Sequence, residues 1–362
     1  MSAGPLLSLC IPTYNRASLL EPMLQSLCRQ CAAFGERVEI VVSDNASTDA
    51  TPAVVATASA IHPIRYFRND ENVGSRNFLL AVERASGEYG WVLGDDDLVL
   101  DGGLQTITQA LLAHGEIDYF YVNYFTAPMA VRDEFLRDEG TGRLPGVDEC
   151  VVREPESRRL DSWEHIFDLR TSSAVEVNTS ILSSVFRRTE WQRCAGLLRM
   201  SQSPMVSAAD TSLDDLFPHV KILAHAMAGR AGYYIAQPCA LMGQGGQEWL
   251  TDWPAITITG MNQALLLYER LALEPSRLRR LWRSHFMRAA EYMPLIGRRR
   301  GASCMQGYGW GEYLWRSRHR LDIFAVVVAR RLHPGKWLKA HLPAPLFAVL
   351  RGAWRTAAQR AR

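Results

Sequence analysis

The sequence predicts an α/β protein with a mainly parallel sheet and a helical C-terminal extension. Three observations lead to this prediction. Short apolar runs alternate with helical patterns over about the first 125 residues, polar clusters follow the first four of these runs, and beyond about residue 261 the pattern changes to helices rich in Leu, Trp and Arg. Regular alternation of strand and helix patterns is typical of parallel sheets with helices on both faces.

The first four strands are predicted where short runs are rich in apolar and β-branched residues. They cover residues 6–11, 38–42, 64–67 and 89–93. Helices are predicted between them, because apolar residues recur there at a helical period. They cover residues 17–32, 47–60 and 73–85. Later elements are less regular: an insertion or β-hairpin at 126–159, strands at 181–186 and 233–235, and a helix at 210–229 that Pro218 interrupts.

A polar cluster follows each of the first four predicted strands. The clusters are residues 12–16, 43–47, 68–72 and 94–97. Because the carboxyl ends of parallel strands meet at one edge of the sheet, where ligands bind, these clusters predict a binding site. Surface solvation is the alternative, but it does not require four successive clusters at strand ends.

The last cluster contains three adjacent carboxylates, Asp95, Asp96 and Asp97. Such charges repel one another unless a cation neutralises them. Carboxylate oxygens suit Mg²⁺ or Mn²⁺, which proteins commonly hold through one or two carboxylates together with substrate phosphates. The alternative is an acidic turn in which Asp97 or Asp101 caps the next helix. The motif alone does not decide between them.

Four segments carry a resemblance to a known family. They are SLCIPTYNR, EIVVSDNASTDAT, RNDENVGSRNF and ASGEYGWVLGDDD, in that order over about residues 6–110. Together they resemble inverting glycosyltransferase family 2, and the LGDDD and RNF variants resemble O-antigen sugar transferases of the abequosyltransferase type. The resemblance implies a glycosyltransferase-A fold, Rossmann-like in its mainly parallel sheet. It also implies an enzyme, a hexosyl- or deoxyhexosyltransferase that is metal-dependent and inverting.

The same resemblance implies the donor and the acceptor. The donor would be a nucleoside-diphosphate sugar, and the acceptor a glycan or a polyprenyl-diphosphate-linked glycan, in bacterial surface polysaccharide synthesis such as that of lipopolysaccharide. Residues 1–255 would then form the catalytic domain, with a nucleotide-sugar half at about 1–125 and an acceptor half at about 160–255. Residues 256–362 would form a basic helical region.

The resemblance also implies site residues for the donor. Pro12, Thr13 and Tyr14 match the loop that lines the base, where the Tyr14 ring can stack. Asp44 matches the carboxylate that accepts a hydrogen bond from the base, and Asn45 belongs to the same loop. Arg76 matches a basic position near the diphosphate. The alternative is that Arg76 is a solvated arginine on a helix.

In the acidic motif the family usually shows D-x-D-D, and Gly94 stands here at the first of these positions. This departure implies that the ribose and metal contacts move to Asp95 and Asp96. Asp96 is the expected direct ligand of Mg²⁺ or Mn²⁺, and Asp97 is expected to support it.

An inverting transfer needs a general base that takes the proton of the attacking hydroxyl. The resemblance implies an acidic residue about 100 positions after the metal motif. Asp215 is our first candidate, Asp214 the second and Asp210 the third, and helix capping is the alternative for each. His219 lies nearby, but a single histidine is more often packed or hydrogen-bonded. The glycine-rich loop at 243–249 indicates either a mobile lid or a plain linker.

Charge is unevenly distributed along the chain. Residues 261–362 contain 20 Lys and Arg against 5 Asp and Glu, whereas residues 1–260 contain 20 against 33. Tryptophans stand between the arginines of the basic part, at Trp282, Trp310, Trp315, Trp337 and Trp354. This combination is typical of an interfacial region on an anionic membrane surface more than of a nucleic-acid reader. An amphipathic bundle packed on the catalytic domain is the alternative.

The remaining features predict a cytoplasmic protein that is peripheral on the membrane. The seven cysteines are scattered and odd in number, as in reduced proteins. No run of about 18 apolar residues is present to span a bilayer. Two other functions stay open: a nucleotidyltransferase acting on sugar phosphates, which would want a glycine- and lysine-bearing loop after the first strand, and a non-catalytic glycan-binding protein on the same fold.

Overall fold

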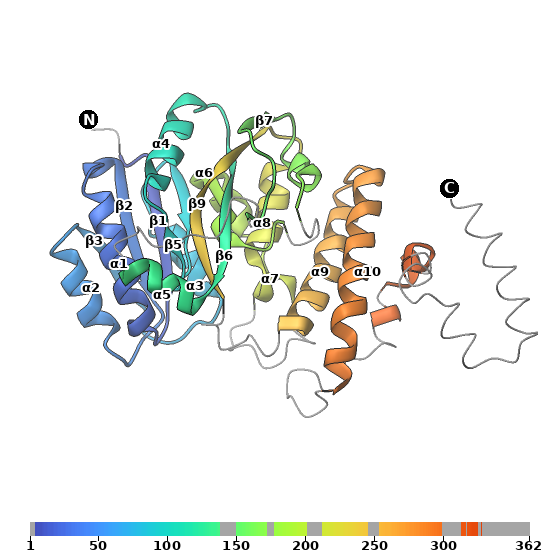
Figure 1. Cartoon of the computed structure of the whole chain (residues 1–362), viewed down its shortest axis with the longest axis horizontal. Coiled ribbons are helices and arrows are strands. Elements are labelled where there is room, and N and C mark those ends of the chain that lie inside the picture. Colours follow the sequence, from blue (N-terminus) through green and yellow to red (C-terminus); the bar gives the residue numbers. More distant parts are fainter. Residues whose placement is uncertain are drawn as a thin grey trace, which may run out of the picture.

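The computed structural model describes residues 4–137, 150–171, 177–200, 212–244, 253–298, 313–315, 317–324 and 327. In this part of the chain one sheet of nine strands runs through the molecule (Figure 1), in the order β3-β2-β1-β4-β8-β6-β9-β5 with β7 paired to β9. Asp210, the loop residues 245–249, and Trp310, Trp337 and Trp354 lie outside the described residues.

The first half of the sheet is entirely parallel, as the sequence predicts. It consists of β3 (Ile64–Arg68), β2 (Val38–Asp44), β1 (Leu7–Thr13) and β4 (Tyr89–Val92). β1 is buried along its whole length, because it is flanked by strands on both sides and covered by helices on both faces. Its carboxyl end is therefore at the centre of the edge where the polar clusters lie.

The second half of the sheet mixes strand directions. β8 (Ser184–Arg187) is antiparallel to both β4 and β6 (Tyr119–Pro128), and β9 (Gly232–Gln244) is parallel to β6. Two short strands, β5 (Leu98–Val99) and β7 (Arg158–Leu160), pair antiparallel with β9. β9 is much longer than the predicted strand at 233–235, because it pairs with β6 again from Ala240 to Gln244, after a register shift that leaves Pro238 outside the paired positions.

Two groups of helices cover the two faces of the sheet and make separate apolar cores. One face is covered by α1 (Ala17–Cys31), α2 (Thr51–Ser59) and α4 (Gly103–Ala113). The other is covered by α3 (Arg76–Glu83), α6 (Arg188–Ala195) and α8 (Pro218–Met227). The predicted insertion contains α5 (Met129–Arg137), and the broken helix consists of α7 (Leu213–Leu216) and α8.

Helices α2 and α3 begin later than predicted. α2 was expected from residue 47, but Ser47 belongs to a loop, and the Asp49 carboxylate accepts a hydrogen bond from the Thr51 amide at the helix start. α3 was expected from residue 73, but Gly74 has a φ of 59°. A residue in that left-handed conformation does not continue a helix.

The helical C-terminal extension is confirmed by α9 (Trp253–Arg270) and α10 (Pro275–Arg298), which pack side by side (Figure 1). Trp282 is fully buried and donates to Glu269 Oε1 at 2.8 Å, so its predicted interfacial position is wrong. Arg277 pairs with Asp168 at 2.6 Å. Part of the basic charge of the C-terminal region is thus paired with acidic residues of the preceding part of the chain. The domain boundary near 255 stays a prediction.

Within the described residues, no helix combines the length and hydropathy that a membrane span requires.

Candidate functional site

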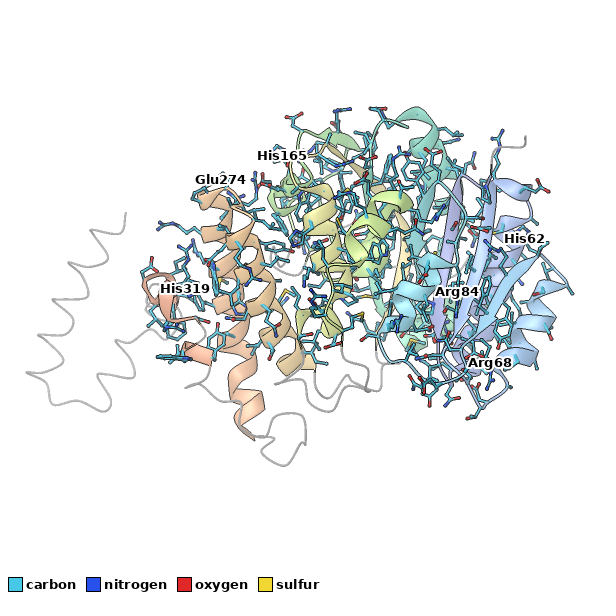
Figure 2. All side chains as sticks on the ribbon, turned by 180° about the vertical axis from the view of Figure 1, so that it is seen from behind. His62, Arg68, Arg84, His165, Glu274 and His319 are labelled. Atoms are coloured by element: carbon cyan, nitrogen blue, oxygen red, sulfur yellow. The ribbon has the colours of Figure 1, made fainter. Side chains whose placement is uncertain are left out.

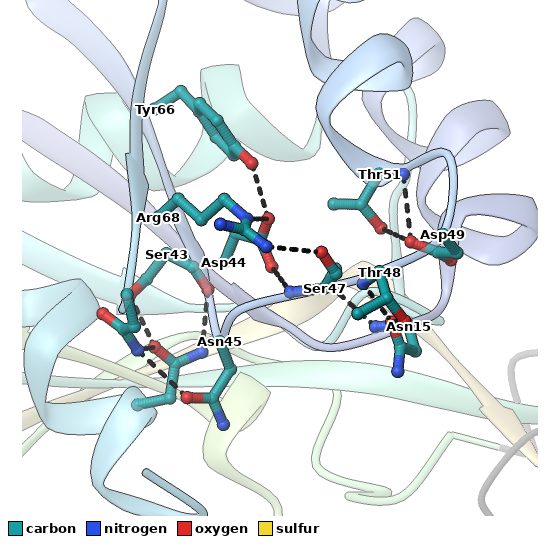
Figure 3. Close-up of polar contacts among 12 residues, drawn as sticks. Asn15, Ser43, Asp44, Asn45, Ser47, Thr48, Asp49, Thr51, Tyr66 and Arg68 are labelled. Atoms are coloured by element: carbon teal, nitrogen blue, oxygen red, sulfur yellow. Dashed lines mark hydrogen bonds and ion pairs between the residues drawn. The ribbon is translucent and has the colours of Figure 1, made fainter. Parts of the chain in front are cut away.

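The loops after β1 and β2 are clamped together at the carboxyl edge of the sheet (Figure 3). Asn15 has a φ of 51°, which turns its side chain and amide toward the second loop. The Asn15 amide donates to Ser47 Oγ at 2.9 Å, and the Thr48 amide donates to Asn15 Oδ1 at 2.7 Å. Asparagine tolerates this backbone region better than most residues. The two loops therefore form one rigid unit.

Asp44 ends β2 and is fully buried at the centre of this unit. Its carboxylate accepts from the Ser47 amide at 2.9 Å and from the Tyr66 hydroxyl at 2.5 Å, and Arg68 Nε lies 3.7 Å away. Burial and the Asp44 carboxylate raise the pKa of Tyr66, which keeps its phenol protonated as the donor. The role of Asp44 toward a base stays a prediction.

The loop after β3 joins through asparagines. Asn45 Nδ2 donates to Asn72 Oδ1 at 2.7 Å, while Asn45 Oδ1 accepts from Asn69 Nδ2 at 3.0 Å and from the Val73 amide at 2.9 Å. Asn45 and Asn69 are buried. Their side chains thus make hydrogen bonds in this loop that strand pairing would otherwise provide. Figure 2 marks this edge of the molecule by Arg68, the last residue of β3.

The acidic loop after β4 is tied to the end of β1. Thr13 Oγ1 donates to Asp95 Oδ2 at 2.9 Å. The Arg16 guanidinium spans two carboxylates, with Nη1 on Asp95 and Nη2 on Asp96 Oδ2 at 2.9 Å. The predicted convergence of the four strand-end clusters is therefore what the structure contains. Arg16 is a site residue that sequence reasoning missed, although it stands within the PTYNR segment.

Asp97 and Gly94 close the acidic loop on itself. The Gly94 amide donates to Asp97 Oδ2 at 2.8 Å. A Cβ at position 94 would lie 2.8 Å from Asp96 Oδ1 and 2.9 Å from Asp97 Oδ2, closer than real Cβ atoms approach. A side chain is therefore excluded here while the carboxylates keep these positions. This contact is a physical reason for glycine at the position where the family usually has an aspartate.

Electrostatics in this loop favour an added cation. All three side chains, Asp95, Asp96 and Asp97, are buried. Burial raises the pKa of Asp95 to about 7 against the lowering effect of Arg16, and burial and the neighbouring Asp96 raise the pKa of Asp97. Carboxylates whose charged forms are disfavoured by burial and by one another are stabilised by a nearby positive ion.

The chemistry of these donors fits a hard divalent cation, but the carboxylates are not arranged around one point. Asp95 and Asp96 face Arg16, whereas Asp97 faces the backbone of Gly94. Among the described residues, no three His, Cys, Asp or Glu side chains are grouped so that they could hold a metal. The ligand set of Asp95, Asp96 and Asp97 stays a prediction. In the structure Asp95 and Asp96 both pair with Arg16.

The end of β9 presses against the acidic loop. A Cβ at Gly243 would lie 2.8 Å from the backbone oxygen of Asp96 and 2.6 Å from Met129 Sδ. Arg132 on α5 also lies here: it is buried, and its Nη2 donates to the Leu19 carbonyl at 3.0 Å. The glycine-rich loop predicted as a lid thus begins beside Asp96. No local sequence signal indicates Arg132, because it lies on α5, after the end of β6 and far from the acidic loop in the sequence.

Gly243→Ala is expected to displace the acidic loop, since the Asp96 carbonyl is backbone and cannot turn away. We expect a loss of about 1 to 3 kcal/mol of unfolding free energy, as for overpacked sites. Chemical denaturation measures it. Gly196→Ala is the matched control, because a Cβ there meets nothing within 4 Å and its φ is −64°. Equal stability of the two variants would contradict this account of Gly243.

The two candidate bases differ in their surroundings. Asp214 is buried, with both carboxylate oxygens on Lys221 Nζ at 2.8 and 3.0 Å, and one also accepts from the Arg199 amide at 2.6 Å. Asp215 is half-buried and accepts from Ser212 Oγ at 2.7 Å, at the start of α7. Asp215 is thus the more accessible of the two, although both serve the local structure. Their catalytic roles stay predictions.

The remaining predicted residues are placed as follows. Tyr14 is 41% exposed, so its ring is available for stacking, while Pro12 is buried inside β1. His219 is buried against the Thr179 carbonyl at 3.0 Å, and burial lowers its pKa to about 4. It is a packed histidine. Arg76 lines a cavity of about 510 Å³ between α3 and α6, together with Trp191. Its predicted role at a diphosphate stays open.

Comparison with known proteins agrees with this geometry. Residues 8–156 match Glycosyl transferase family 2. A segment of 115 residues is 41% identical to abequosyltransferase RfbV of Salmonella typhimurium, covering 31% of this chain and 34% of that protein. Another of 110 residues is 38% identical to GalNAc(5)-diNAcBac-PP-undecaprenol beta-1,3-glucosyltransferase of Campylobacter jejuni, covering 29% of this chain and 34% of that protein. The matches thus span about a third of these relatives.

Solved structures extend the comparison to most of the chain. The S. aureus TarS 1-349 structure in complex with UDP-GlcNAc covers 88% of this chain and 83% of its own length, with a TM-score of 0.57 and 15% sequence identity. The same protein without that ligand gives a TM-score of 0.54. At this identity the likeness concerns the fold, and the predicted glycosyltransferase-A fold is confirmed.

Proposed function

We propose, from the match of residues 8–156 to glycosyl transferase family 2, that this chain is a glycosyltransferase. It would move a sugar from a nucleoside-diphosphate donor, with inversion, to a glycan or lipid-linked glycan. The observation that carries the proposal is that four strand-end loops meet at one edge of the sheet, where Thr13 and Arg16 contact the acidic loop and Asn45 contacts the loop after β3. The names of the relatives from Salmonella and Campylobacter support the sugar and the lipid-linked acceptor.

The nucleoside would lie over the clamp between the β1 and β2 loops. Tyr14 offers an exposed ring for stacking on a base. Asp44 lies buried beneath this clamp, and because Ser47 and Tyr66 hold its carboxylate by both oxygens, it would keep its orientation when a base arrives. A preoriented acceptor lowers the entropy lost on binding.

The diphosphate would approach the acidic loop, where Asp96 and Asp95 would hold Mg²⁺ or Mn²⁺. Such an ion supplies positive charge to the leaving diphosphate as the glycosidic bond breaks. Asp97 would support the loop by holding the Gly94 amide. The Thr13 hydroxyl, which donates to Asp95 Oδ2, would keep the Asp95 carboxylate oriented toward the ribose or the ion.

Asp215 would accept the proton of the attacking acceptor hydroxyl. It is the accessible carboxylate of its pair, and Ser212 orients it at 2.7 Å. The attack forms a bond from the acceptor oxygen to the anomeric carbon while the bond to the diphosphate oxygen breaks, which inverts the configuration. Asp214 would hold α7 against Lys221.

A screen of nucleotide sugars tests this function. Release of nucleoside diphosphate that needs Mg²⁺ or Mn²⁺ supports a transferase. Release of pyrophosphate from a nucleoside triphosphate and a sugar phosphate would instead identify a nucleotidyltransferase. Glycan binding without turnover of any nucleotide sugar would identify a binding protein on this fold.

We further propose that the basic C-terminal region lies on an anionic membrane surface. Trp315 is 64% exposed and Leu321 is 41% exposed, and the Arg318 guanidinium lies 4.3 Å from the centre of the Trp315 ring. An exposed aromatic ring beside an arginine suits the interface between lipid headgroups and acyl chains.

Trp315→Ser combined with Leu321→Ser is expected to weaken binding to phosphatidylglycerol vesicles by about tenfold or more, because each side chain contributes roughly 1.5 to 3 kcal/mol when buried. Vesicle sedimentation of the full chain measures it. Leu112→Ser is the control, since Leu112 is 61% exposed on α4. Unchanged binding by the double variant, or no binding by the wild type, would refute the membrane proposal.

A further inference from the structure

Arg16 supplies positive charge to the acidic loop from a fixed position. It precedes α1 directly, and the Ala17 amide donates to Asp49 Oδ2 at 2.9 Å, which anchors the helix start to the β2 loop. Asn15, in its left-handed conformation, sets the direction of the next residue. The backbone of Arg16 is therefore held on both sides, while its long side chain reaches across to the loop after β4.

The two nitrogens of the Arg16 fork contact the two carboxylates that are the best candidates for a metal. The side chains of Asp95 and Asp96 are only 4% and 8% exposed, whereas that of Arg16 is 24% exposed. Opposite charges and hydrogen bonds hold the pair together. The two carboxylates are thus buried, whereas the guanidinium has solvent beside it.

A divalent cation held by Asp95 and Asp96 would compete with the Arg16 guanidinium, which contacts Asp95 Oδ1 and Asp96 Oδ2. A cation that binds alone must therefore displace a charge-assisted pair and stay close to the positive charge that it displaced. A cation that arrives with a diphosphate meets different conditions. The phosphate oxygens accept a bidentate contact from the released guanidinium, and they neutralise both positive charges.

We propose that Arg16 is an internal counter-ion of the acidic loop, and that it makes divalent cation binding depend on the donor diphosphate. In the free protein Arg16 neutralises Asp95 and Asp96. When donor and cation bind, the Arg16 guanidinium moves from these carboxylates to the diphosphate. This inference rests on the proposed metal-dependent function, and it assigns Arg16 as a donor-contacting residue that neither the motif nor the comparisons indicate.

The test removes the charge of Arg16 and measures metal binding without turnover. Mn²⁺ is titrated into the full chain, wild type and Arg16→Gln, with the free ion followed by electron paramagnetic resonance. The titration is repeated with saturating UDP, GDP, CDP or dTDP. Wild type is expected to bind Mn²⁺ weakly alone and at least about tenfold more tightly with the matching nucleotide, which corresponds to a coupling of about 1.4 kcal/mol.

Arg16→Gln is expected to bind Mn²⁺ alone about tenfold or more tightly than the wild type, and to lose most of the nucleotide dependence. Thermal unfolding gives a second readout. Without metal the variant should unfold at a lower temperature, because two buried carboxylates lose their partner, and Mn²⁺ should raise that temperature more than in the wild type. Arg29→Gln is the control, since it removes an exposed arginine from the same helix.

Two results would overturn the inference. If Arg16→Gln binds Mn²⁺ alone no more tightly than the wild type, Arg16 does not compete with the metal. If neither protein binds Mn²⁺ with any of the nucleotides, the metal dependence in the proposed function fails as well. The first result leaves that function intact, so the two failures are distinguishable.

Discussion

Asp96→Ala is expected to lower metal-dependent turnover of the nucleotide sugar by about 10³-fold or more. A metal that neutralises a leaving diphosphate contributes several kcal/mol to the transition state, and about 4 kcal/mol corresponds to roughly 10³-fold. Asp96 is buried, and Arg16 Nη2 lies 2.9 Å from its Oδ2, so its replacement removes a charge at the centre of the acidic loop. Initial rates at saturating Mn²⁺ measure the effect.

Two controls separate loss of chemistry from loss of structure. Asp101→Asn changes an exposed acidic residue just beyond the same loop and should keep wild-type turnover. Circular dichroism of Asp96→Ala should retain the wild-type secondary structure. Asp96→Ala with wild-type metal-dependent turnover would show that the acidic loop is not the metal site.

Asp215→Asn is expected to lower the turnover number by about 10²- to 10⁴-fold while donor binding is unchanged, because a general base acts on the acceptor and not on the donor. The asparagine keeps the size of the side chain and its acceptor for Ser212 Oγ. Single-turnover kinetics with donor and acceptor measure the chemical step, and thermal stabilisation by the donor measures its binding.

Asp214→Asn is the matched control on the same turn. It weakens the contact with Lys221 Nζ at 2.8 Å and places a polar amide where the Arg199 amide donates. We expect a loss of about 1 to 3 kcal/mol of stability with turnover close to that of the wild type. The reverse pattern, with turnover lost in Asp214→Asn and kept in Asp215→Asn, would exchange the two assignments.

The parallel half of the fold could be predicted because each of its strands is a short apolar run and each loop a polar cluster. Local pattern carries less information in the second half. β9 crosses Pro238 and a register shift before it reaches Gly243 beside the acidic loop. Its length is set by pairing with β6, which is more than 100 residues earlier in the sequence. No window of the sequence contains both partners.

Single residues of the site show the same limit. The resemblance of the motifs was enough to indicate Asp44, Asp95 and Asp96, because family spacing marks them. It did not indicate Arg16 or Arg132, because these residues are identified only by their contacts. Arg16 contacts carboxylates 79 and 80 positions later in the sequence, and Arg132 contacts the Leu19 carbonyl 113 positions earlier. Trp282 was expected at a membrane surface for a similar reason, because its sequence neighbours do not reveal that its indole donates to Glu269 on α9.

Gly94 has a consequence for how this loop can vary. An aspartate there would add a fourth carboxylate to the loop, and its Cβ would lie within 3 Å of Asp96 Oδ1 and of Asp97 Oδ2, which the Gly94 amide already holds. The D-x-D-D form of the motif would thus require the Asp96 and Asp97 side chains to occupy other positions than they do here. Gly94 and the positions of the Asp96 and Asp97 side chains thus depend on one another, and a change at one of these three positions is expected to alter the other two.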